Sequence, residues 1–307
     1  MAEIPGVHTY QSVKPYLFSV AYRMTGSASD AEDLIQDAWL RYIAAGLPPV
    51  DSLRAYLTTI VSRLALDFLK SARVQREQYV GPWMPEPVLT REIAPGPADS
   101  AEQRETVSMA FLMLLEQLSP EQRVVYVLRE GFDLAYEDIA AHIDKTAAAC
   151  RQIFRRARTR LDSERMPAIA PGRDHQRIVE RFLAAFETGN TARIAALLAS
   201  DAVWVGDGGP DRLATRRPVL GSDRIARGLA GFVRKSAPAR PLAFDLADIN
   251  GATGIVVLHE GAVDQVITFD ISDGRIATVR SMRNLDKLRH IELALGAKPP
   301  ALAQDSV

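Results

Sequence analysis

Two proline-rich breaks constrain the fold of this chain more than any other feature of its sequence. The first, Gly81 to Pro97, reads GPWMPEPVLTREIAPGP and contains five prolines; the second, Arg165 to Gly172, reads RMPAIAPG. Because proline lacks a backbone N–H and its ring clashes with the preceding helical turn, neither segment can belong to a continuous helix. The 307 residues are therefore expected to form three folded units. These units are 8–80, 98–164 and 173–295, with 81–97 as a linker.

The first unit is predicted to be all-helical. Residues 29–45 and 53–73 both repeat apolar side chains at the three- and four-residue spacing of an amphipathic helix. Ser29 or Asp30 is the expected N-cap of the first of these helices, because a short polar side chain there accepts a backbone N–H. The segment 46–52, GLPPVDS, can only be a loop.

The second unit is also predicted to be helical. A first helix is expected within 101–117, and Ser119 then caps a helix that ends at Gly131. A short helix follows at 136–143, and after a three-residue turn a long helix covers 147–161. A short helix, a tight turn and a longer helix form the layout of a helix-turn-helix.

The third unit changes from helices to strands. Helices are expected at 173–188 and near 191–199, and Asn250-Gly251 and Asp273-Gly274 are typical hairpin turns. The predicted strands are 202–205, 242–249, 254–258, 265–271 and 275–283. Helices followed by a strand meander indicate an α+β domain rather than a parallel α/β sheet.

Composition excludes several classes of protein. Cys150 is the single cysteine, so the chain forms no internal disulfide and holds no cysteine-based zinc site. No apolar run approaches the roughly 18 residues of a membrane span, and the N-terminus lacks the apolar core of a signal peptide. We expect a cytoplasmic protein that contacts no membrane and needs neither metal nor cofactor.

The net charge of −1 gives no reason by itself to expect a nucleic-acid partner, but the charges are segregated. Residues 81–140 have a net charge of −7, whereas residues 141–166 have a net charge of +4. Lys145 to Arg160 contains six basic residues and no acidic one. Such asymmetry favours an anionic partner for this segment.

In a helix-turn-helix, the second helix reads bases with its N-terminal residues and neutralises phosphates further along. An apolar face is expected at Ala149, Ile153, Ala157 and Leu161, which turns the basic residues outward. The residues placed for bases are Lys145, Thr146, Arg151 and Gln152, and those placed for phosphates or guanines are Arg155, Arg156 and Arg158. The alternative interpretation is a solvated basic helix face.

Asp30, Asp33 and Asp37 share one face of the predicted helix 29–45, which is either a docking surface or a solvated face whose acids suit the helix dipole. The sequence SDAEDLIQDAWLRY, followed by SLRAYLTTIVSRLALDFLKSAR, resembles region 2 of bacterial sigma factors of the extracytoplasmic-function type. LSPEQRVVYVLREGFDLAYEDIAAHIDKTAAACRQIFRRARTRL resembles region 4 of the same family.

The linker and the third unit resemble a subgroup of these sigma factors with a SnoaL-like C-terminal domain. Its WxPEP linker motif corresponds to Trp83-Met84-Pro85-Glu86-Pro87, and its glycine-rich DGG motif to Asp207-Gly208-Gly209. The resemblance implies two all-α domains followed by a cone-shaped α+β domain. These motifs make Trp83, Glu86, Asp207, Gly208 and Gly209 the candidates for regulatory contacts. Because a covalently attached domain has a high effective concentration, we expect the C-terminal domain to fold back on region 2 and to set how far regions 2 and 4 separate.

The resemblance further implies a promoter-specificity subunit whose partners are core RNA polymerase and promoter DNA. Polymerase docking falls to Asp30, Asp33, Gln36, Asp37 and Arg41. Binding of the minus-ten element falls to Arg54, Arg63, Lys70 and Arg73, with Tyr56 and Phe68 as candidates for base stacking and Phe68 expected in the core. The helix-turn-helix residues listed above are then expected at the minus-35 element.

Two other function classes stay open at this point. The SnoaL-like fold also serves cyclases and isomerases, for which Asp207, His259 or Asp264 is the candidate general base, with Trp204 as a wall. A helix-turn-helix repressor with a ligand-sensing domain is the other class, and it predicts tight DNA binding without polymerase. We expect a regulatory rather than a catalytic domain.

Overall fold

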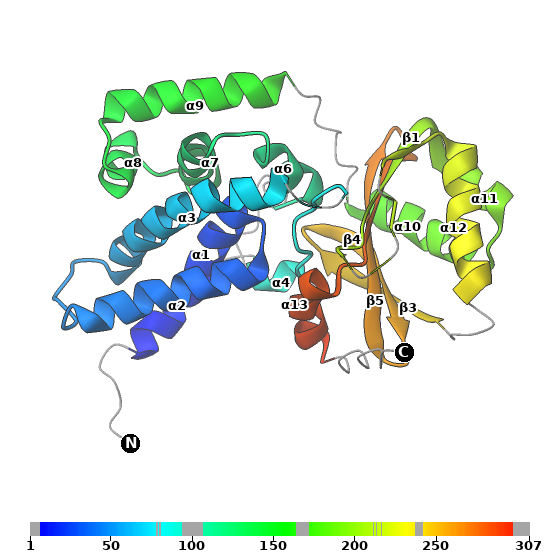
Figure 1. Cartoon of the computed structure of the whole chain (residues 1–307), viewed down its shortest axis with the longest axis horizontal. Helices are drawn as coiled ribbons and strands as arrows, with labels where there is room; N and C mark the ends of the chain where they lie inside the picture. Colours follow the sequence, from blue (N-terminus) through cyan, green and yellow to red (C-terminus); the bar gives the residue numbers. More distant parts are fainter. Residues whose placement is uncertain are drawn as a thin grey trace. The chain divides into compact units, whose positions relative to one another are not determined.

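The computed structural model describes residues 7–77, 79, 81–93, 107–163, 172–210, 212, 214–215, 217–236 and 242–296, with the backbone alone for 7–9, 73–77, 235 and 236. The chain falls into two compact units. The helical unit consists of residues 1–78 and 91–166, and the C-terminal unit of residues 79–90 and 167–307. A piece of the proline-rich linker thus belongs to the same unit as the C-terminal sheet, which Figure 1 draws in yellow-green to orange.

The first half of the helical unit is a bundle of three long helices. They are α1 (Val7–Thr25), α2 (Ala28–Ala44) and α3 (Leu53–Glu77). A short helix, α4 (Thr90–Ile93), lies within the predicted linker 81–97. Leu17, Ile35 and Leu57 are fully buried where the three long helices pack together. Periodicity predicted α2 and α3 correctly, although α3 continues four residues past its predicted end.

The N-cap of α2 was predicted wrongly. Ser27, rather than Ser29 or Asp30, caps this helix, and its hydroxyl accepts the backbone N–H of Asp30 at 3.1 Å. Gly26 adopts a φ of 70°, which lets the chain reverse immediately before Ser27. The helix therefore begins one residue earlier than its acidic first turn suggested.

The second half of the helical unit contains the helix-turn-helix. Its elements are α6 (Met109–Leu115), α7 (Pro120–Tyr126), the π-helical turn Val127–Gly131, α8 (Tyr136–Ile143) and α9 (Ala147–Asp162). Ser119 forms a full capping box with Gln122, which confirms the predicted start of α7. The expected helix 101–117 is described only from residue 107 onward.

The C-terminal unit is a six-stranded mixed sheet with helices. The helices are α10 (Gly172–Glu187), α11 (Thr191–Leu197), α12 (Ser222–Ser236) and α13 (Leu285–Leu295). The strands are β1 (Leu198–Asp207), β2 (Val219–Leu220), β3 (Leu242–Ile249), β4 (Ala252–His259), β5 (Ala262–Ser272) and β6 (Arg275–Met282). Their order in the sheet is β2-β1-β6-β5-β4-β3, and only β1 and β6 pair in parallel.

The predicted α+β class is confirmed, and tight turns explain the meander from β3 to β6. Asn250-Gly251 and Asp273-Gly274 both have two consecutive positive φ values, as does Glu260-Gly261 between β4 and β5. Helices α12 and α13 and strand β2 were not predicted, and β1 begins at Leu198 rather than at residue 202.

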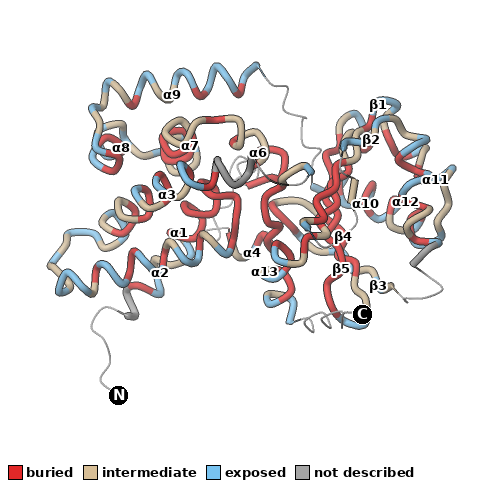
Figure 2. The backbone as a smooth tube through the Cα atoms, viewed as in Figure 1, coloured by how far each residue is buried: buried red, intermediate tan, exposed pale blue. Residues whose placement is uncertain are grey.

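Helices α10 to α12 cover one face of this sheet, where the core lies (Figures 1 and 2). Phe182 and Phe186 of α10 stack on each other, and Phe269 of β5 meets Phe182 edge to face at 4.9 Å between ring centroids. Helix α13 lies on the other side of the sheet from α10 to α12 and packs against β5 (Figure 1). Among the helices that the structure describes, none is long and apolar enough to cross a membrane.

Candidate functional site

Helix α9 presents the most basic surface of the helical unit. Thr146 caps its N-terminus by accepting the backbone N–H of Ala149 at 3.1 Å, and Cys150, Ala157 and Leu161 form its buried stripe. The predicted apolar face was partly wrong, because Cys150 rather than Ala149 is fully buried and Ile153 is only half-buried. Burial raises the pKa of the Cys150 thiol, so this residue has a packing role.

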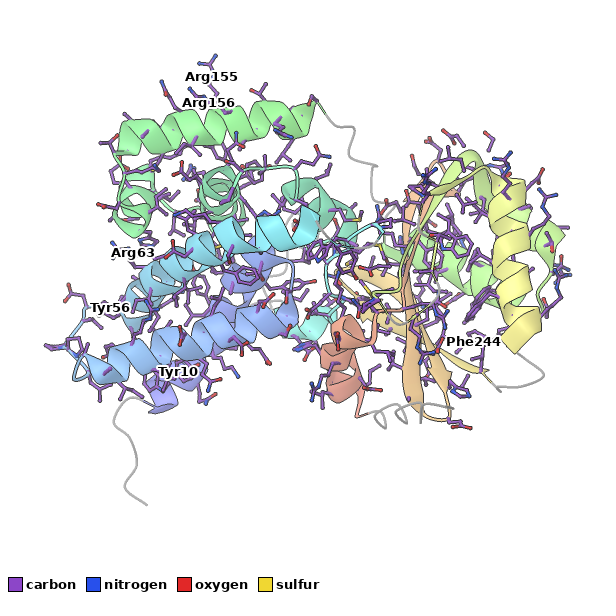
Figure 3. The ribbon with its side chains drawn as sticks, viewed as in Figure 1. Tyr10, Tyr56, Arg63, Arg155, Arg156 and Phe244 are labelled. Atoms are coloured by element: carbon purple, nitrogen blue, oxygen red, sulfur yellow. The ribbon has the colours of Figure 1, made fainter. Side chains whose placement is uncertain are left out.

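The outer face of α9 is open to solvent. Arg155 and Arg156 extend away from the helix (Figure 3), and neither forms an ion pair with an acidic residue of the described chain. They belong to a shallow groove along the helix, which is lined by Gln152, Arg155, Arg156, Thr159, Arg160 and Ser163. Two exposed guanidiniums without a carboxylate partner are suited to phosphate, because arginine binds phosphate oxygens through two parallel N–H donors.

Other basic residues predicted for DNA have acidic partners in the same unit. Lys145 Nζ lies 3.0 Å from Glu121 of α7, and a guanidinium nitrogen of Arg151 lies 2.7 Å from Glu137 of α8. Arg158 lies 3.9 Å from Asp162 one helical turn further on. These are solvent-accessible contacts, which hold side chains weakly and exchange readily for a phosphate.

Arg63 of α3 contacts α8 in this structure. Its Nε donates to the carbonyl of His142 at 3.0 Å, and a terminal nitrogen donates to the carbonyl of Ala141 at 3.1 Å (Figure 3). A cation at the last turn of a helix is favoured by the helix dipole. Beside it, Thr59 shares a hydrogen bond with His142 Nδ1, and burial lowers the pKa of His142. The predicted region 2 and region 4 helices are therefore packed together.

The remaining candidates on α3 are spread along its length. The Arg54 guanidinium lies over the Tyr16 ring, 5.1 Å from its centroid, and Lys70 pairs with Asp67. Tyr56 is half-buried against Tyr42. Phe68 is half-buried rather than part of the core, and the side chain of Arg73 lies outside the described residues.

The acidic face of α2 also carries an exposed leucine. Asp33, Gln36 and Asp37 are exposed, Asp30 is half-buried, and Arg41 pairs loosely with Asp37 at 3.6 Å. Leu40 lies on the same face, three residues after Asp37, and 52% of its surface is exposed. Sequence reasoning missed Leu40, although an apolar residue placed off the buried stripe was a usable signal.

The C-terminal unit contains a buried carboxylate that binds the linker. Asp207, at the end of β1, is only 1% exposed. Its Oδ1 accepts the Tyr79 hydroxyl at 2.5 Å, while its Oδ2 accepts the backbone N–H of Met84 at 3.0 Å and Lys287 Nζ at 2.8 Å. We call Asp207, Tyr79, Met84, Lys287 and Asn284 the Asp207 clamp.

Lys287 and Asn284 complete the Asp207 clamp from α13. Lys287 Nζ also donates to the Met84 carbonyl at 2.7 Å and lies over the rings of Tyr79 and Trp83. Asn284 Nδ2 donates to the Tyr79 hydroxyl at 2.8 Å. Burial, together with the hydrogen bond to Asp207, raises the pKa of Tyr79, so its hydroxyl keeps its proton and donates.

A second set of contacts holds the end of the linker segment. Val88 exchanges two hydrogen bonds with Asn250, and the Thr90 hydroxyl donates to Asp248 at 2.7 Å. Leu89 forms an isolated antiparallel bridge with Ile249. Residues 79–90 are thus fixed to the C-terminal unit at both ends.

The glycines of the predicted DGG motif are required by close packing. A Cβ on Gly208 would lie 2.2 Å from the carbonyl oxygen of Arg212, and Gly209 has a φ of 61°. The N–H of Gly209 also donates to Asp207 Oδ1, which makes the motif a turn as well as a linker site. Trp83 is half-buried over Lys287, and Glu86 is buried.

The carboxylates proposed as catalytic bases are engaged by basic groups. Asp264 forms ion pairs with Arg212 and Arg283, both at 3.1 Å, and Asp207 binds the linker. His259 ends β4 and is half-buried. Trp204 does line a cavity, as predicted. Within the described ranges, no three His, Cys, Asp or Glu side chains converge as metal ligands would.

Two helical modules, the second ending in a helix-turn-helix with a basic α9, define a DNA-binding transcription protein of the sigma type. Family models match Sigma-70 region 2 at residues 9–74, Sigma-70 region 4 at residues 108–161 and a SnoaL-like domain at residues 179–279. The chain belongs to the extracytoplasmic-function (ECF) family of RNA polymerase sigma factors and carries a C-terminal SnoaL-like domain.

Two relatives from Mycobacterium tuberculosis match almost the whole chain. The ECF RNA polymerase sigma factor SigJ is 35% identical over 291 residues, which cover 92% of both chains. The probable ECF sigma factor SigI is 30% identical and covers 91% of this chain and 94% of its own. The crystal structure of SigJ superposes with a TM-score of 0.73 and covers 92% of this chain and 98% of that one.

Proposed function

We propose that this sigma factor binds core RNA polymerase through the acidic face of α2 and reads its promoter through α3 and α9. We further propose that its C-terminal unit regulates this activity by holding residues 79–90. The single observation that carries the regulatory part is the Asp207 clamp, in which a buried carboxylate binds the chain that joins region 2 to region 4.

The polymerase-binding role is supported by the chemistry of α2. Gln36 and Asp37 lie one helical turn before Leu40 on the same face, Asp33 lies one turn further back, and Arg41 follows Leu40 in the chain. The Leu40 side chain is solvent-exposed. An apolar anchor inside a charged rim is the usual anatomy of a protein interface. On this proposal, Asp30 supports the surface from the first turn of the helix.

The DNA-binding role divides between two helices. On α9, Arg155 and Arg156 are placed for phosphates, and Lys145, Thr146, Arg151 and Gln152 lie near the N-terminal end where base edges are read. On α3, Arg54, Arg63, Lys70 and Arg73 follow the strand of the minus-ten element. Because Arg63 donates to α8 in the compact state, its use on DNA requires α3 and α8 to separate.

The Asp207 clamp is suited to limit that separation. Residues 79–90 connect α3 to α4, and a fully extended chain of this length spans about 40 Å. While the C-terminal unit binds both ends of the segment, residues 79–90 cannot extend to this span. The clamp therefore restricts how far region 2 and region 4 move apart, and so which spacings between promoter elements the holoenzyme accepts.

A spacer-length series tests the proposal. Reconstituted holoenzyme is assayed for transcription from promoters whose minus-ten and minus-35 elements are separated by successive single-base-pair insertions and deletions. We expect a narrow optimum for the wild type and a broader profile for Asp207→Asn, with at least threefold more transcript at the flanking spacings. Asp201→Asn, an exposed carboxylate on the same strand, is the matched control.

Truncation after Arg165 provides the second arm of this experiment. The truncated chain is expected to show the same broad profile as Asp207→Asn. Unchanged spacing profiles and unchanged affinity for core polymerase in both variants would contradict the regulatory proposal. Tight, specific promoter binding by the wild type without polymerase would instead favour a helix-turn-helix repressor.

A further inference from the structure

The C-terminal unit contains a partly open cavity of about 180 Å³ beside the Asp207 clamp. Trp204 of β1 and Leu229 and Phe232 of α12 form its apolar walls. An apolar protein cavity of about 150 Å³ holds a benzene molecule, so this one accommodates a single substituted ring. We propose that the cavity is a binding site for a small, neutral, hydroxylated aromatic molecule.

The packing around Trp204 fixes one wall of the cavity. A Cβ on Gly228 of α12 would lie 2.8 Å from Trp204 Cζ3, so the helix can approach the indole only because residue 228 is a glycine. The indole N–H donates to the Ser281 hydroxyl at 2.8 Å, which fixes the ring as a wall. Phe232 is fixed in turn by stacking on Phe186.

Two uncharged polar atoms, both buried on the cavity lining, show what the ligand must carry. The Arg283 guanidinium also lies on the lining, and it is paired with Asp264 at 3.1 Å. Gln265 of β5 is 2% exposed, and its Oε1 accepts no hydrogen bond from any residue that the structure describes. The hydroxyl oxygen of Thr215 is also buried, and it forms no hydrogen bond with any residue that the structure describes. Buried polar atoms in native proteins are nearly always hydrogen-bonded, so two on one lining point to a missing partner.

The chemistry of these atoms selects a hydroxyl group. The amide oxygen of Gln265 needs a donor, which neither a hydrocarbon nor a carboxylate supplies. The Ser281 hydroxyl accepts the indole N–H and keeps its own proton to donate, and Thr215 can donate as well. A ligand O–H that donates to Gln265 and accepts from Ser281 or Thr215 satisfies both requirements.

The cavity shares its strands with the Asp207 clamp. Gly206, on the cavity lining, directly precedes Asp207, and the backbone N–H of Arg283, also on the lining, donates to the Asp207 carbonyl at 2.7 Å. A ligand that orders these two strand ends is therefore expected to act on the linker. This coupling rests on the proposed function, whereas binding itself does not.

Binding to the full-length protein is measured by titration calorimetry with three probes, para-cresol, toluene and benzoate. We expect para-cresol to bind at least tenfold more tightly than toluene, which corresponds to about 1.4 kcal/mol, and more tightly than benzoate. Ala214→Leu fills the cavity and is expected to abolish binding. Equal affinity for para-cresol and toluene, no binding of para-cresol, or full binding by Ala214→Leu would overturn the proposal.

A second variant, Gln265→Leu, tests the proposal even if Ala214→Leu does not fold. This change removes the unsatisfied acceptor, so the tenfold preference for para-cresol over toluene is expected to disappear. Gln176→Leu, the same substitution at an exposed position of α10, is expected to keep that preference. Retention of the preference in Gln265→Leu would show that Gln265 does not read the hydroxyl and would refute the assignment.

The coupling is tested separately with the spacer-length series. Saturating para-cresol is expected to change the wild-type profile and to leave that of Asp207→Asn unchanged. Binding with no effect on the profile would refute the coupling while leaving the site intact. Failure of the regulatory proposal therefore cannot be mistaken for failure of the binding site.

Discussion

Asp207 binds the linker, its own turn and helix α13 at the same time. Its carboxylate accepts hydrogen bonds from the Tyr79 hydroxyl, from two backbone N–H groups and from Lys287, while its carbonyl accepts two further N–H groups. A fully buried carboxylate is tolerated only when such partners replace water. The network therefore depends on the charge of this one residue.

Asp207→Asn is expected to lower the free energy of unfolding of the C-terminal unit by about 3–5 kcal/mol, because it leaves the Lys287 ammonium buried without its counter-charge. Denaturant titration followed by circular dichroism measures the change. Asp201→Asn, on the exposed part of β1, is expected to alter stability by less than about 0.5 kcal/mol.

The double variant Asp207→Asn with Lys287→Met tests whether the unpaired charge of Lys287 or the altered side chain at 207 causes the loss of stability. Since it removes both buried charges, it is expected to recover part of the stability that Asp207→Asn loses. A double variant no more stable than the single one would contradict the view that the unpaired ammonium causes the loss.

Single residues also show where sequence reasoning stops. Asp207, Gly208 and Gly209 could be singled out only through the family resemblance, and the partners of Asp207 could not be predicted. Tyr79 and Met84 lie 128 and 123 residues away along the chain, so no local pattern links them to β1. Lys287 belongs to a helix that the sequence did not indicate at all.

At the scale of the element, apolar spacing and capping residues predicted where helices begin and end. Helix α8 has the predicted bounds, and the capping box at Ser119 fixed the start of α7. Helix α12 was missed because Gly228 and Gly231 weaken its helical propensity. Gly228 is needed there because a Cβ at this position would collide with Trp204. Tertiary contact overrides local preference at that position.

Helix α9 allows a quantitative prediction about DNA binding. Arg156→Ala is expected to weaken holoenzyme binding to promoter DNA and to reduce the slope of log affinity against log salt concentration by about 0.9, because one phosphate contact is lost. Fluorescence anisotropy over a salt series measures the slope. Arg177→Ala, at an exposed arginine on α10, is expected to leave the slope unchanged, and equal slopes for all three proteins would contradict the assignment.

At the scale of the whole molecule, the contact between α3 and α8 makes stability depend on pH. Burial lowers the pKa of His142 below its ordinary value of about 6.5, so the unfolded chain binds a proton that the folded chain excludes. Stability is therefore expected to fall as the pH drops below about 6.5. Burial lowers the pKa of His175 in the C-terminal unit as well, which acts in the same direction.

His142→Asn separates the two contributions. Asparagine can keep the hydrogen bond to Thr59 but does not titrate, so the urea midpoint of the variant is expected to vary less between pH 7.5 and pH 5.5 than that of the wild type. Midpoints determined by circular dichroism at several pH values give this comparison. Parallel profiles would show that His142 is not a source of the dependence.

The parallel pairing of β1 with β6 has a consequence for synthesis on the ribosome. Strand β1 can join the sheet only when β6, some seventy residues later, has emerged, and Lys287 comes later still. At about 5–20 residues per second, the roughly 125 residues between the end of region 4 and Lys287 take about 6–25 s to add. Region 2 and region 4 are thus complete well before the Asp207 clamp can close. On the proposed function, a nascent chain is an unrestrained sigma factor during this interval, and a chain terminated within it stays so.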